Sequence, residues 1–362
     1  MAKFSVSCGG TGGHVFPGMA TAKALQGRGH EVTLWLSGKA IETATRHAWN
    51  GAVVSTGAEK LSFHPLRLPR TLFNLRRVYC ASVRTLKEQK PRALLAMGSY
   101  SSLGPVLAAR RLGIPVVLHE ANVVPGKATS ALSRFATAVA ISFPETREHL
   151  KHPSITLTGL PLRQEMEEAA ATPATAPSVF TVLTMGGSQG AQRLNETVPP
   201  ALGRLLAMGI PVDAIHLSGE QAKASVEQAY RAAGVPATVY GFCTDMVSVY
   251  RRTSLAISRS GANSCLELAL FGIPALLVPY PHSVRDHQLE NARAMAKAGA
   301  ANLIEQQDLT PGRLTEAIRA FAIARGKLDA MRAAAHTRSL PGADVRLAEL
   351  MEAVAATTPA SN

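Results

Sequence analysis

Two glycine-rich turns in this 362-residue chain have the composition to hold a phosphate group. The first, CGGTGGH at residues 8–14, follows the apolar run FSVS, and the second, GGSQGA at residues 186–191, follows FTVLTM. A strand that feeds a helix through glycines leaves backbone N–H groups unpaired at the positive end of the helix dipole, which attracts anions. Neither turn carries the G-x-G-x-x-G pattern of dinucleotide-binding enzymes or the G-x-x-x-x-G-K-[ST] loop of nucleoside triphosphatases. The two turns therefore indicate phosphate binding outside those two classes.

Polar side chains that could act on a bound substrate follow the first turn and a later apolar run. His14 comes directly after the first turn, and a histidine of ordinary pKa can act as a base or as a neutral donor near pH 7. Glu120 and Asn122 follow the run PVVLH, at the carboxyl end of a predicted strand, where parallel sheets place their ligands. Each of these side chains could instead stabilise its own loop, so the sequence leaves both roles open.

A third segment suits a nucleoside diphosphate. The residues ISRSGANSCLELAL at 257–270 predict a strand, a turn and a helix, and the start of that helix offers backbone donors and serine hydroxyls to phosphate. Glu267 lies about one helical turn further along, where a carboxylate can accept hydrogen bonds from both ribose hydroxyls. Gln288 and Asn291 lie near the start of the next helical segment and suit the hydroxyl and amide groups of a sugar.

The elements that must position these residues alternate between short apolar runs and helical patterns, as in βα units on parallel sheets. The predicted strands are FSVS, VTLWL, ALLAM, PVVLH and AVAIS in the first part, and FTVLTM, DAIHL, TVYGF, LAISR and ALLVP in the second. We therefore predict an α/β fold with two Rossmann-like domains that face a central cleft.

The domain boundaries are predicted from composition. A chain of this length accommodates about two domains. We place an N-terminal domain at residues 1–166, a linker of small residues and prolines at 167–178, and a C-terminal domain at 179–342. The apolar helical pattern at 343–356 is expected to pack back on the first domain.

The charge balance indicates an anionic partner. The chain has 38 basic and 25 acidic residues, a net charge of +13, which favours nucleic acid, anionic lipid or a phosphorylated substrate. Aromatic residues are scarce and no nucleic-acid-binding motif occurs, so we expect no nucleic-acid partner. The four cysteines lie far apart and indicate neither a zinc site nor a disulfide framework, which fits a reducing cytoplasm. The sequence has no D-x-D pair, and we expect no essential metal and no other cofactor.

Residues 63–87 form a basic amphipathic segment, FHPLRLPRTLFNLRRVYCASVRTLK, of the kind that lies in an anionic membrane interface. An ordinary helix with arginines on its solvated side is the alternative. No apolar stretch is long enough to span a bilayer, and the N-terminus shows no secretory signal, so any membrane contact is expected to be peripheral. The predicted membrane patch consists of Leu72, Phe73, Leu75, Arg76, Arg77, Val78 and Tyr79.

In these segments the chain resembles the MurG family of bacterial transferases over nearly its full length. The resemblance rests on GGTGGHVFPG at 9–18, MGSYSSLGP at 97–105, IPVVLHEAN at 114–122, GGSQGA at 186–191, RSGANSCLE at 259–267 and DHQ at 286–288. It implies a GT-B glycosyltransferase architecture, with an acceptor- and membrane-side first domain and a UDP-sugar-binding second domain. It also implies transfer of N-acetylglucosamine from UDP-N-acetylglucosamine to lipid I, the undecaprenyl-diphosphoryl muramyl pentapeptide, giving lipid II for peptidoglycan synthesis.

The resemblance also implies an inverting reaction on the cytoplasmic face of the inner membrane and assigns residues to it. His14 would be the catalytic base, with Glu120 as the second candidate. The implied substrate-binding residues are Thr11, Gly12, Gly13, Asn122, Arg163, Ser188, Cys243 through its backbone, Ala262, Asn263, Ser264, Cys265, Leu266, Glu267 and Gln288. The positions that depart from the family pattern, all in regions of fine sugar contacts, are Ser99 for a glycine, Ala121 for a glutamine and Leu160 for an asparagine.

Three other functions remain open at this point. A UDP-N-acetylglucosamine epimerase would use a similar pair of Rossmann-like domains without a lipid acceptor. Another UDP-sugar glycolipid glycosyltransferase would share the UDP-binding half. A nonenzymatic sugar-nucleotide sensor need not keep both glycine turns together with His14, Asn122 and Glu267.

Overall fold

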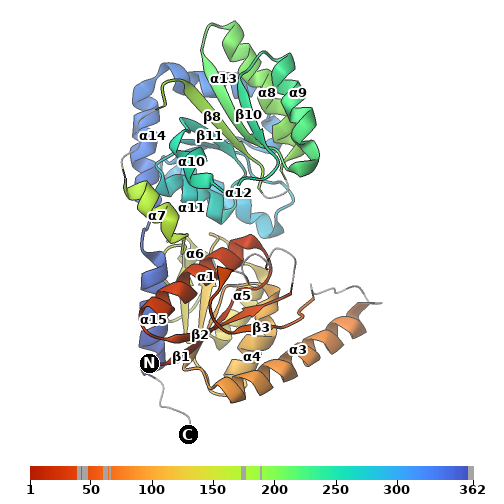
Figure 1. The fold of residues 1–362 in the computed structure, drawn as a ribbon, viewed down its shortest axis with the longest axis vertical. Coiled ribbons are helices and arrows are strands. Elements are labelled where there is room, and N and C mark those ends of the chain that lie inside the picture. The colour runs from red at the N-terminus through yellow and green to blue at the C-terminus, as the bar shows by residue number, and fades with distance from the viewer. Residues whose placement is uncertain are drawn as a thin grey trace. The chain divides into compact units, whose positions relative to one another are not determined.

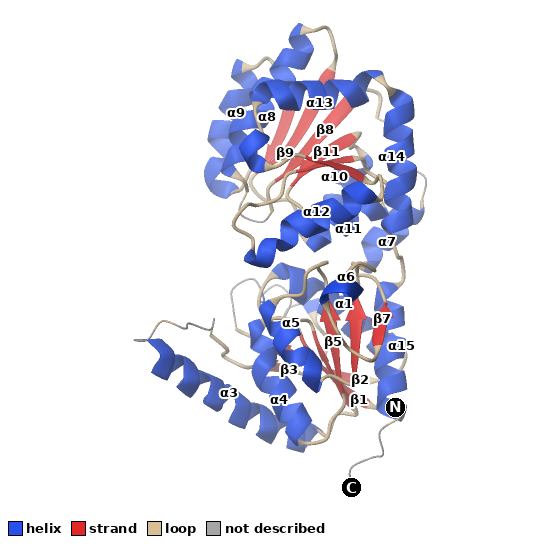
Figure 2. Ribbon diagram, turned by 180° about the vertical axis from the view of Figure 1, so that it is seen from behind, coloured by secondary structure: helices blue, strands red, loops and turns tan. Residues whose placement is uncertain are grey.

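The structure is a computed structural model, and it describes residues 1–38, 42, 48–59, 64, 67–172, 177–187 and 190–357 (Figure 1). The chain divides into two compact units. Unit 1 comprises Met1–Gln164 and Leu340–Asn362, and unit 2 comprises Glu165–Ser339. Each unit is a parallel sheet with helices packed against it (Figure 2).

Unit 1 has a parallel sheet in the strand order β3-β2-β1-β4-β5-β6-β7 among the described residues. The strands are β1 (Lys3–Ser7), β2 (Glu31–Leu36), β3 (Val53–Ser55), β4 (Ala93–Ala96), β5 (Val116–Glu120), β6 (Ala138–Ile141) and β7 (Ile155–Leu157). The helices are α1 (Gly12–Gly27), α3 (Leu68–Gln89), α4 (Leu103–Arg111), α5 (Lys127–Leu132), α6 (Thr146–His149) and α15 (Ala343–Ala356). The order is that of a Rossmann sheet, in which ligands bind beyond the carboxyl ends of the strands.

The alternation of side chains along each strand places an apolar core on both faces of this sheet. On one face, Phe4 and Val6 of β1 pack with Leu25 of α1 and with Leu347 and Met351 of α15. The other face carries a second buried cluster, to which α3, α4 and α5 contribute. Helix α15 is therefore part of the core of unit 1, although it lies at the far end of the sequence.

A charged cluster also ties α15 to unit 1. Arg28 at the C-terminal end of α1 donates two hydrogen bonds to Glu352, from Nε to Oε1 at 2.9 Å and from Nη2 to Oε2 at 2.7 Å. His30 Nε2 lies 2.7 Å from the same Oε1 atom. The hydrogen bonds from Arg28, opposed in part by burial and supported by His30, lower the pKa of Glu352 to about 2, so this carboxylate is ionised near neutral pH.

Unit 2 repeats the architecture with a parallel sheet in the order β10-β9-β8-β11-β12-β13 among the described residues. The strands are β8 (Phe180–Met185), β9 (Val212–Leu217), β10 (Ala237–Tyr240), β11 (Leu255–Ser258), β12 (Ala275–Leu277) and β13 (Ala301–Leu303). The helices are α7 (Gln164–Ala171), α8 (Gln192–Ala207), α9 (Lys223–Ala232), α10 (Met246–Arg251), α11 (Ala262–Leu270), α12 (His287–Lys297), α13 (Pro311–Ile323) and α14 (Arg325–Arg338). The predicted α/β fold with two Rossmann-like sheets is confirmed.

Every strand predicted from an apolar run is present, and three further strands, β3, β7 and β13, complete the sheets. Each of the three is three residues long, lies at a sheet edge and is partly exposed. The predicted linker at residues 167–178 also differs from the structure, because α7 extends to Ala171. The glutamates and alanines at its start favour a helix over an extended linker.

Candidate active site

In unit 1, the first glycine turn connects β1 to α1. Thr11 is the N-cap of α1, and Gly12, Gly13 and the half-buried His14 form its first turn. The His14 N–H donates to the Thr11 carbonyl at 2.9 Å, which leaves the N–H groups of Gly12 and Gly13 as the donors at the start of the helix. The Nδ1 atom of His14 lies 3.0 Å from the Thr11 hydroxyl. Further along α1, a side chain in place of Gly18 would collide with Cys8 of the turn, so this glycine permits the close helix–strand packing that a third glycine provides in dinucleotide-binding folds.

The loops after β4 and β5 lie beside this turn. The Ser101 hydroxyl, just after β4, donates a hydrogen bond of 2.6 Å to the carbonyl of Gly9. His119 in β5 is 1% exposed, and its Nε2 atom lies 3.1 Å from the carbonyl of Gly159. Burial lowers the pKa of His119 to about 4, partly offset by the Gly159 contact, and the charge of His14 lowers it further. His119 is therefore neutral near pH 7, and His14 is close enough to influence it.

Glu120 and Asn122 form one local network after β5. The Oε1 atom of Glu120 accepts hydrogen bonds from the backbone N–H and the side-chain amide of Asn122, at 3.0 and 3.1 Å, and Oε2 accepts one from the backbone N–H of Gly126 at 3.0 Å. Thr146 donates to the carbonyl of Asn122 at 3.1 Å. The buried Glu120 carboxylate thus stabilises the loop that carries Asn122, a role that the sequence had left open beside that of a base.

In unit 2, the second glycine turn connects β8 to α8. Ser188 lies outside the described residues. Gly190 adopts a φ of +75°, and a Cβ atom there would collide with the carbonyl of Ser218 after β9, so only glycine fits. Asn195 in α8 donates to the same carbonyl at 3.0 Å, and its own Oδ1 atom lies 2.9 Å from Nε2 of the buried His216. This buried network fixes the turn against the neighbouring strand.

Helix α11 begins at the carboxyl end of β11, with Gly261 as its N-cap and Ala262 as its first residue. Asn263 and Ser264 are partly exposed in the first turn. Glu267 follows, half-buried, and its Oε2 atom accepts a hydrogen bond of 2.7 Å from the hydroxyl of Tyr250 in α10. The tyrosine thereby orients a carboxylate about one turn from a helix N-terminus, an arrangement suited to a ribose next to a diphosphate.

Two predicted substrate-binding residues in α11, Cys265 and Leu266, have buried side chains. They are 1% and 6% exposed and pack in the core of unit 2, and their assignment to substrate binding stays a prediction. The backbone N–H of Cys265 already donates to the carbonyl of Gly261 at 3.0 Å. Burial raises the pKa of the Cys265 thiol to about 12, so it remains protonated.

Gln288, in the first turn of α12, is one of several residues whose hydrogen bonds hold together the loops at the carboxyl edge of this sheet. Its Oε1 atom accepts a hydrogen bond of 3.0 Å from the backbone N–H of Tyr280, and its carbonyl accepts one of 2.7 Å from the Ser260 hydroxyl. Arg259, directly after β11, donates to the carbonyls of Val278 and Pro279, both at 3.0 Å. Sequence reasoning assigned Arg259 no role, and its position in the RSGANSCLE motif was the available signal.

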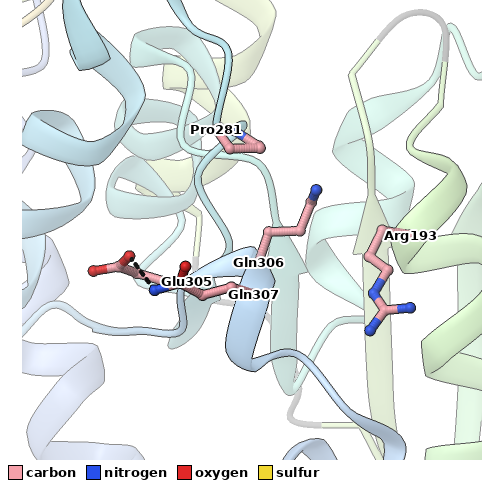
Figure 3. A pocket seen from close by; sticks show the side chains of 5 residues that line it. All are labelled: Arg193, Pro281, Glu305, Gln306 and Gln307. Carbon is pink, nitrogen blue, oxygen red and sulfur yellow. Dashed lines mark hydrogen bonds between the residues drawn. The ribbon is translucent and has the colours of Figure 1, made fainter.

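Arg259 also reaches a hollow of about 340 Å³ at the same edge, donating to Gln306 Oε1 at 2.5 Å. Figure 3 shows this hollow, which is lined by Arg193 near the start of α8, by Pro281, and by Glu305, Gln306 and Gln307 after β13. The prediction from sequence missed these five residues. They are contributed by three separate segments, and only the adjacency of Arg193 to the second glycine turn marked any of them.

The two remaining predicted contacts lie apart from these clusters in sequence. Arg163 is half-buried at the end of unit 1, immediately before α7. Cys243 lies in the loop between β10 and α10, where its Sγ atom contacts the carbonyl of Asp245 at 3.5 Å. The predicted residues therefore form two sets, each at the carboxyl edge of its own parallel sheet. His14, Glu120 and Asn122 belong to the first set, and Glu267 and Gln288 belong to the second.

Residues 68–87 of the predicted membrane segment lie in helix α3, residues 63, 65 and 66 lie outside the described residues, and part of the predicted patch is buried. Leu72 and Phe73 are 57% and 71% exposed, Arg76 and Arg77 are exposed, and Leu75 is half-buried. Val78, in contrast, is 3% exposed and lies against Gly104 of α4, and Tyr79 packs against the core on the same side of the sheet. The exposed patch therefore excludes these last two residues. None of the helices in the described ranges is both long and apolar enough to cross a membrane.

Comparisons with known proteins agree along the chain. Residues 4–141 match the glycosyltransferase family 28 N-terminal domain, and residues 181–347 match the glycosyltransferase family 28 C-terminal domain. A relative from Chelativorans sp. (strain BNC1) is 36% identical over 356 residues, which cover 97% of this chain and 94% of the relative. That protein is named UDP-N-acetylglucosamine--N-acetylmuramyl-(pentapeptide) pyrophosphoryl-undecaprenol N-acetylglucosamine transferase.

Among solved structures, MurG from Acinetobacter baumannii superposes with a TM-score of 0.80 at 30% identity, covering 98% of this chain and 100% of that one. A putative UDP-N-acetylglucosamine 2-epimerase from Listeria monocytogenes superposes with a TM-score of 0.73 at 14% identity, covering 99% and 98% of the two chains. The second similarity shows a shared fold alone. The similarity to the epimerase therefore carries no argument for epimerase activity, whereas the similarity to the transferases extends to the sequence.

Proposed function

Because the chain belongs to the MurG group of glycosyltransferase family 28, we propose that it transfers N-acetylglucosamine from UDP-N-acetylglucosamine to the muramyl 4-hydroxyl of lipid I. The product is lipid II, the disaccharide-linked lipid precursor of peptidoglycan. The similarity over 97% of the chain to a transferase of that name carries the proposal. The two helix N-termini that follow glycine turns, one in each unit, suit a reaction in which both substrates contain a diphosphate.

The donor is assigned to unit 2. In this assignment, the Glu267 carboxylate, oriented by Tyr250, accepts hydrogen bonds from the ribose hydroxyls, and the N-terminus of α11 at Ala262 stabilises the diphosphate. The backbone near Cys243 contacts the uracil end, and Gln288 contributes to recognition of the sugar. Negative charge grows on the diphosphate as UDP departs, so hydrogen-bond donors fixed before the reaction lower its barrier.

The chemical step is an inverting displacement at the anomeric carbon. The 4-hydroxyl oxygen of the muramyl sugar forms a bond to that carbon while the bond to the β-phosphoryl oxygen of UDP breaks, and UDP leaves with the electron pair. His14 takes the hydroxyl proton. With Nδ1 donating to the Thr11 hydroxyl, Nε2 carries the lone pair that accepts this proton. Glu120 is engaged by three donors of its own loop, which supports its use in positioning Asn122.

Direct transfer tests the proposed activity. The purified protein is incubated with radiolabelled UDP-N-acetylglucosamine and a lipid I analogue, and the label is expected in a disaccharide lipid. Label recovered as free UDP-N-acetylmannosamine would instead indicate epimerase activity. Absence of label in the lipid, with an active transferase as positive control, would contradict the proposal.

We further place the enzyme as a peripheral protein on the cytoplasmic face of the bacterial inner membrane, where its lipid-linked acceptor lies. The exposed surface of α3 supports this placement, because Leu72 and Phe73 offer apolar contacts next to the exposed Arg76 and Arg77. Such a surface binds anionic lipid through burial of apolar groups together with electrostatic attraction. It belongs to unit 1, the unit to which we assign the lipid acceptor.

Replacing Leu72 and Phe73 with serine is expected to weaken binding to vesicles containing phosphatidylglycerol by about tenfold or more, since both side chains lose apolar contact with the bilayer. Vesicle sedimentation measures the affinity. The matched control replaces Met208 and Ile323, two exposed apolar residues of unit 2, with serine and should bind vesicles like the wild type. Both variants should retain wild-type affinity for UDP. Equal vesicle binding by L72S/F73S and the wild type would exclude α3 as the membrane surface.

A further inference from the structure

A buried carboxylate outside all the predicted site residues contacts the first glycine turn. Glu42 is 1% exposed. Its Oε1 atom accepts hydrogen bonds from the backbone N–H of Gly10 at 2.9 Å, from the Ser37 hydroxyl at 2.6 Å and from the Ser37 backbone N–H at 3.2 Å. Its Oε2 atom accepts one from the backbone N–H of Gly38 at 2.6 Å. Within the described ranges, this one carboxylate accepts hydrogen bonds from four donors.

These donors come from two loops that follow neighbouring strands. Gly10 follows β1, whereas Ser37 and Gly38 follow β2, and the two strands pair up to Ser7 and Trp35. Glu42 therefore connects the glycine turn to the loop on one side of it. On the other side, the Ser101 hydroxyl after β4 donates to the carbonyl of Gly9. The turn is held from both adjacent strands, by an acceptor for one of its N–H groups and a donor for one of its carbonyls.

The charge state of Glu42 follows from these contacts. Burial raises the pKa of the carboxyl group, but the hydrogen bonds from Ser37, Gly10 and Gly38 outweigh burial and lower the pKa below its ordinary value. The side chain is therefore an ionised carboxylate near neutral pH. A buried charge of this kind is unfavourable unless its acceptor positions are filled, so the conformation in which Gly10 points its N–H at Glu42 is strongly preferred.

The preferred conformation of Gly10 would affect the substrate through the N-terminus of α1. Gly10 adopts a φ of +136°, and the chain turns there into Thr11 and the first helical residues, Gly12 and Gly13. The N–H of Gly10 is occupied by Glu42, so the donors available to a diphosphate are those at the start of the helix. Fixing Gly10 fixes the direction of those donors and of His14, which follows them.

We propose that Glu42 is a positioning residue for glycosyl transfer, which holds the first glycine turn in the conformation that presents the N-terminus of α1 and His14 to the reacting groups. Its effect on turnover rests on the proposed transferase function. Its effect on the turn does not, and can be measured without substrate. The two effects are therefore tested separately.

The first experiment measures amide hydrogen exchange in the peptide covering residues 8–16. In Glu42→Gln the side chain keeps its shape but loses its charge and one of its two acceptor oxygens, so the Gly10 N–H either bonds a weaker neutral acceptor or loses its acceptor. Exchange in this peptide is expected to rise about tenfold over wild type. Ser37→Ala removes a different donor to the same oxygen and leaves the Gly10 bond, and Glu31→Gln alters an exposed carboxylate of β2 paired with Lys3. Both should exchange like wild type, and unchanged exchange in Glu42→Gln would overturn the proposal.

The second experiment measures kcat and UDP affinity for the same proteins. Glu42→Gln is expected to lose about tenfold or more in kcat while UDP affinity stays within about twofold of wild type, because the UDP-binding residues belong to unit 2. Ser37→Ala should keep kcat near the wild-type value even if its Tm falls. A kcat that falls in proportion to Tm in both variants would mean a merely structural role and overturn the proposal.

Should Glu42→Gln fail to fold, the same two measurements are made on Glu42→Asp, whose carboxylate is one methylene further from Gly10. The expected changes in exchange and kcat are the same. Wild-type protein that transfers no sugar would refute the proposed function, and the exchange measurement would still decide whether Glu42 holds the turn.

Discussion

Replacing His14 with alanine is expected to lower kcat for N-acetylglucosamine transfer by about 100-fold or more, the usual contribution of a positioned general base. His14 lies in the first turn of α1, and its contact with the Thr11 hydroxyl orients the imidazole ring. The other histidine at this edge, His119, is buried and neutral, and its Nε2 atom is engaged by the Gly159 carbonyl. No proton acceptor of comparable reach replaces His14 among the residues assigned to the site.

Initial-rate kinetics with a lipid I analogue measure this effect, and calorimetry with UDP serves as the binding control. His149→Ala provides the matched variant, because His149 is an exposed histidine of the same unit and should retain wild-type kcat. UDP should bind His14→Ala with wild-type affinity, since its binding residues are assigned to unit 2. A kcat within about threefold of wild type would remove His14 as the base, because a lost general base costs far more than that.

Replacing Glu267 with alanine is expected to weaken UDP binding by about 100-fold. The carboxylate is assigned to both ribose hydroxyls, and each hydrogen bond to a charged group contributes about 1.5–3 kcal/mol, of which about 1.4 kcal/mol equals a tenfold change in affinity. The hydrogen bond from Tyr250 orients the carboxylate, so Tyr250→Phe should show a smaller loss, about tenfold or less.

Calorimetric titration with UDP gives these affinities directly. Glu316→Gln, which changes an exposed glutamate of α13 in the same unit, is the matched control and should bind UDP like wild type. The comparison with 2′,3′-dideoxy-UDP, which is uridine diphosphate without the two ribose hydroxyls, isolates the proposed contact. Wild type should bind this analogue weakly, whereas Glu267→Ala should discriminate little between it and UDP. Strong discrimination by Glu267→Ala would place the ribose contact elsewhere.

The fold was predictable because its long strands are continuous apolar runs that are buried on both faces. β1 and β8, each followed by glycines and a helix, are clear examples. The strands that escaped prediction, β3, β7 and β13, contain three residues each, too few to show a period, and they form only where an existing sheet edge offers hydrogen-bond partners. Their formation depends on tertiary structure that a local pattern does not contain.

The residues of the candidate site also divide into those that the sequence predicts and those that depend on tertiary structure. His14 and Glu267 belong to short motifs in which the strand, the turn and the helix are contiguous, so their positions followed from the sequence. Glu42 lies 32 residues after Gly10, which it contacts, and its role depends on two loops meeting after adjacent strands. The buried side of α3 could have been found, because Val78, Ser82 and Leu86 recur every four residues and mark one face of a helix.

The position of α15 determines when the first unit can be completed during synthesis. All of unit 2 lies between the two chain segments that build unit 1, so the ribosome makes the whole of unit 2 before α15 emerges. Leu347 and Met351 fill the core against β1 and α1, so the part of that face which α15 covers stays open until α15 has been synthesised. The usual order, in which the N-terminal domain folds first, is therefore reversed here for the final step. Unit 2 can therefore complete its core before α15 has been added to unit 1.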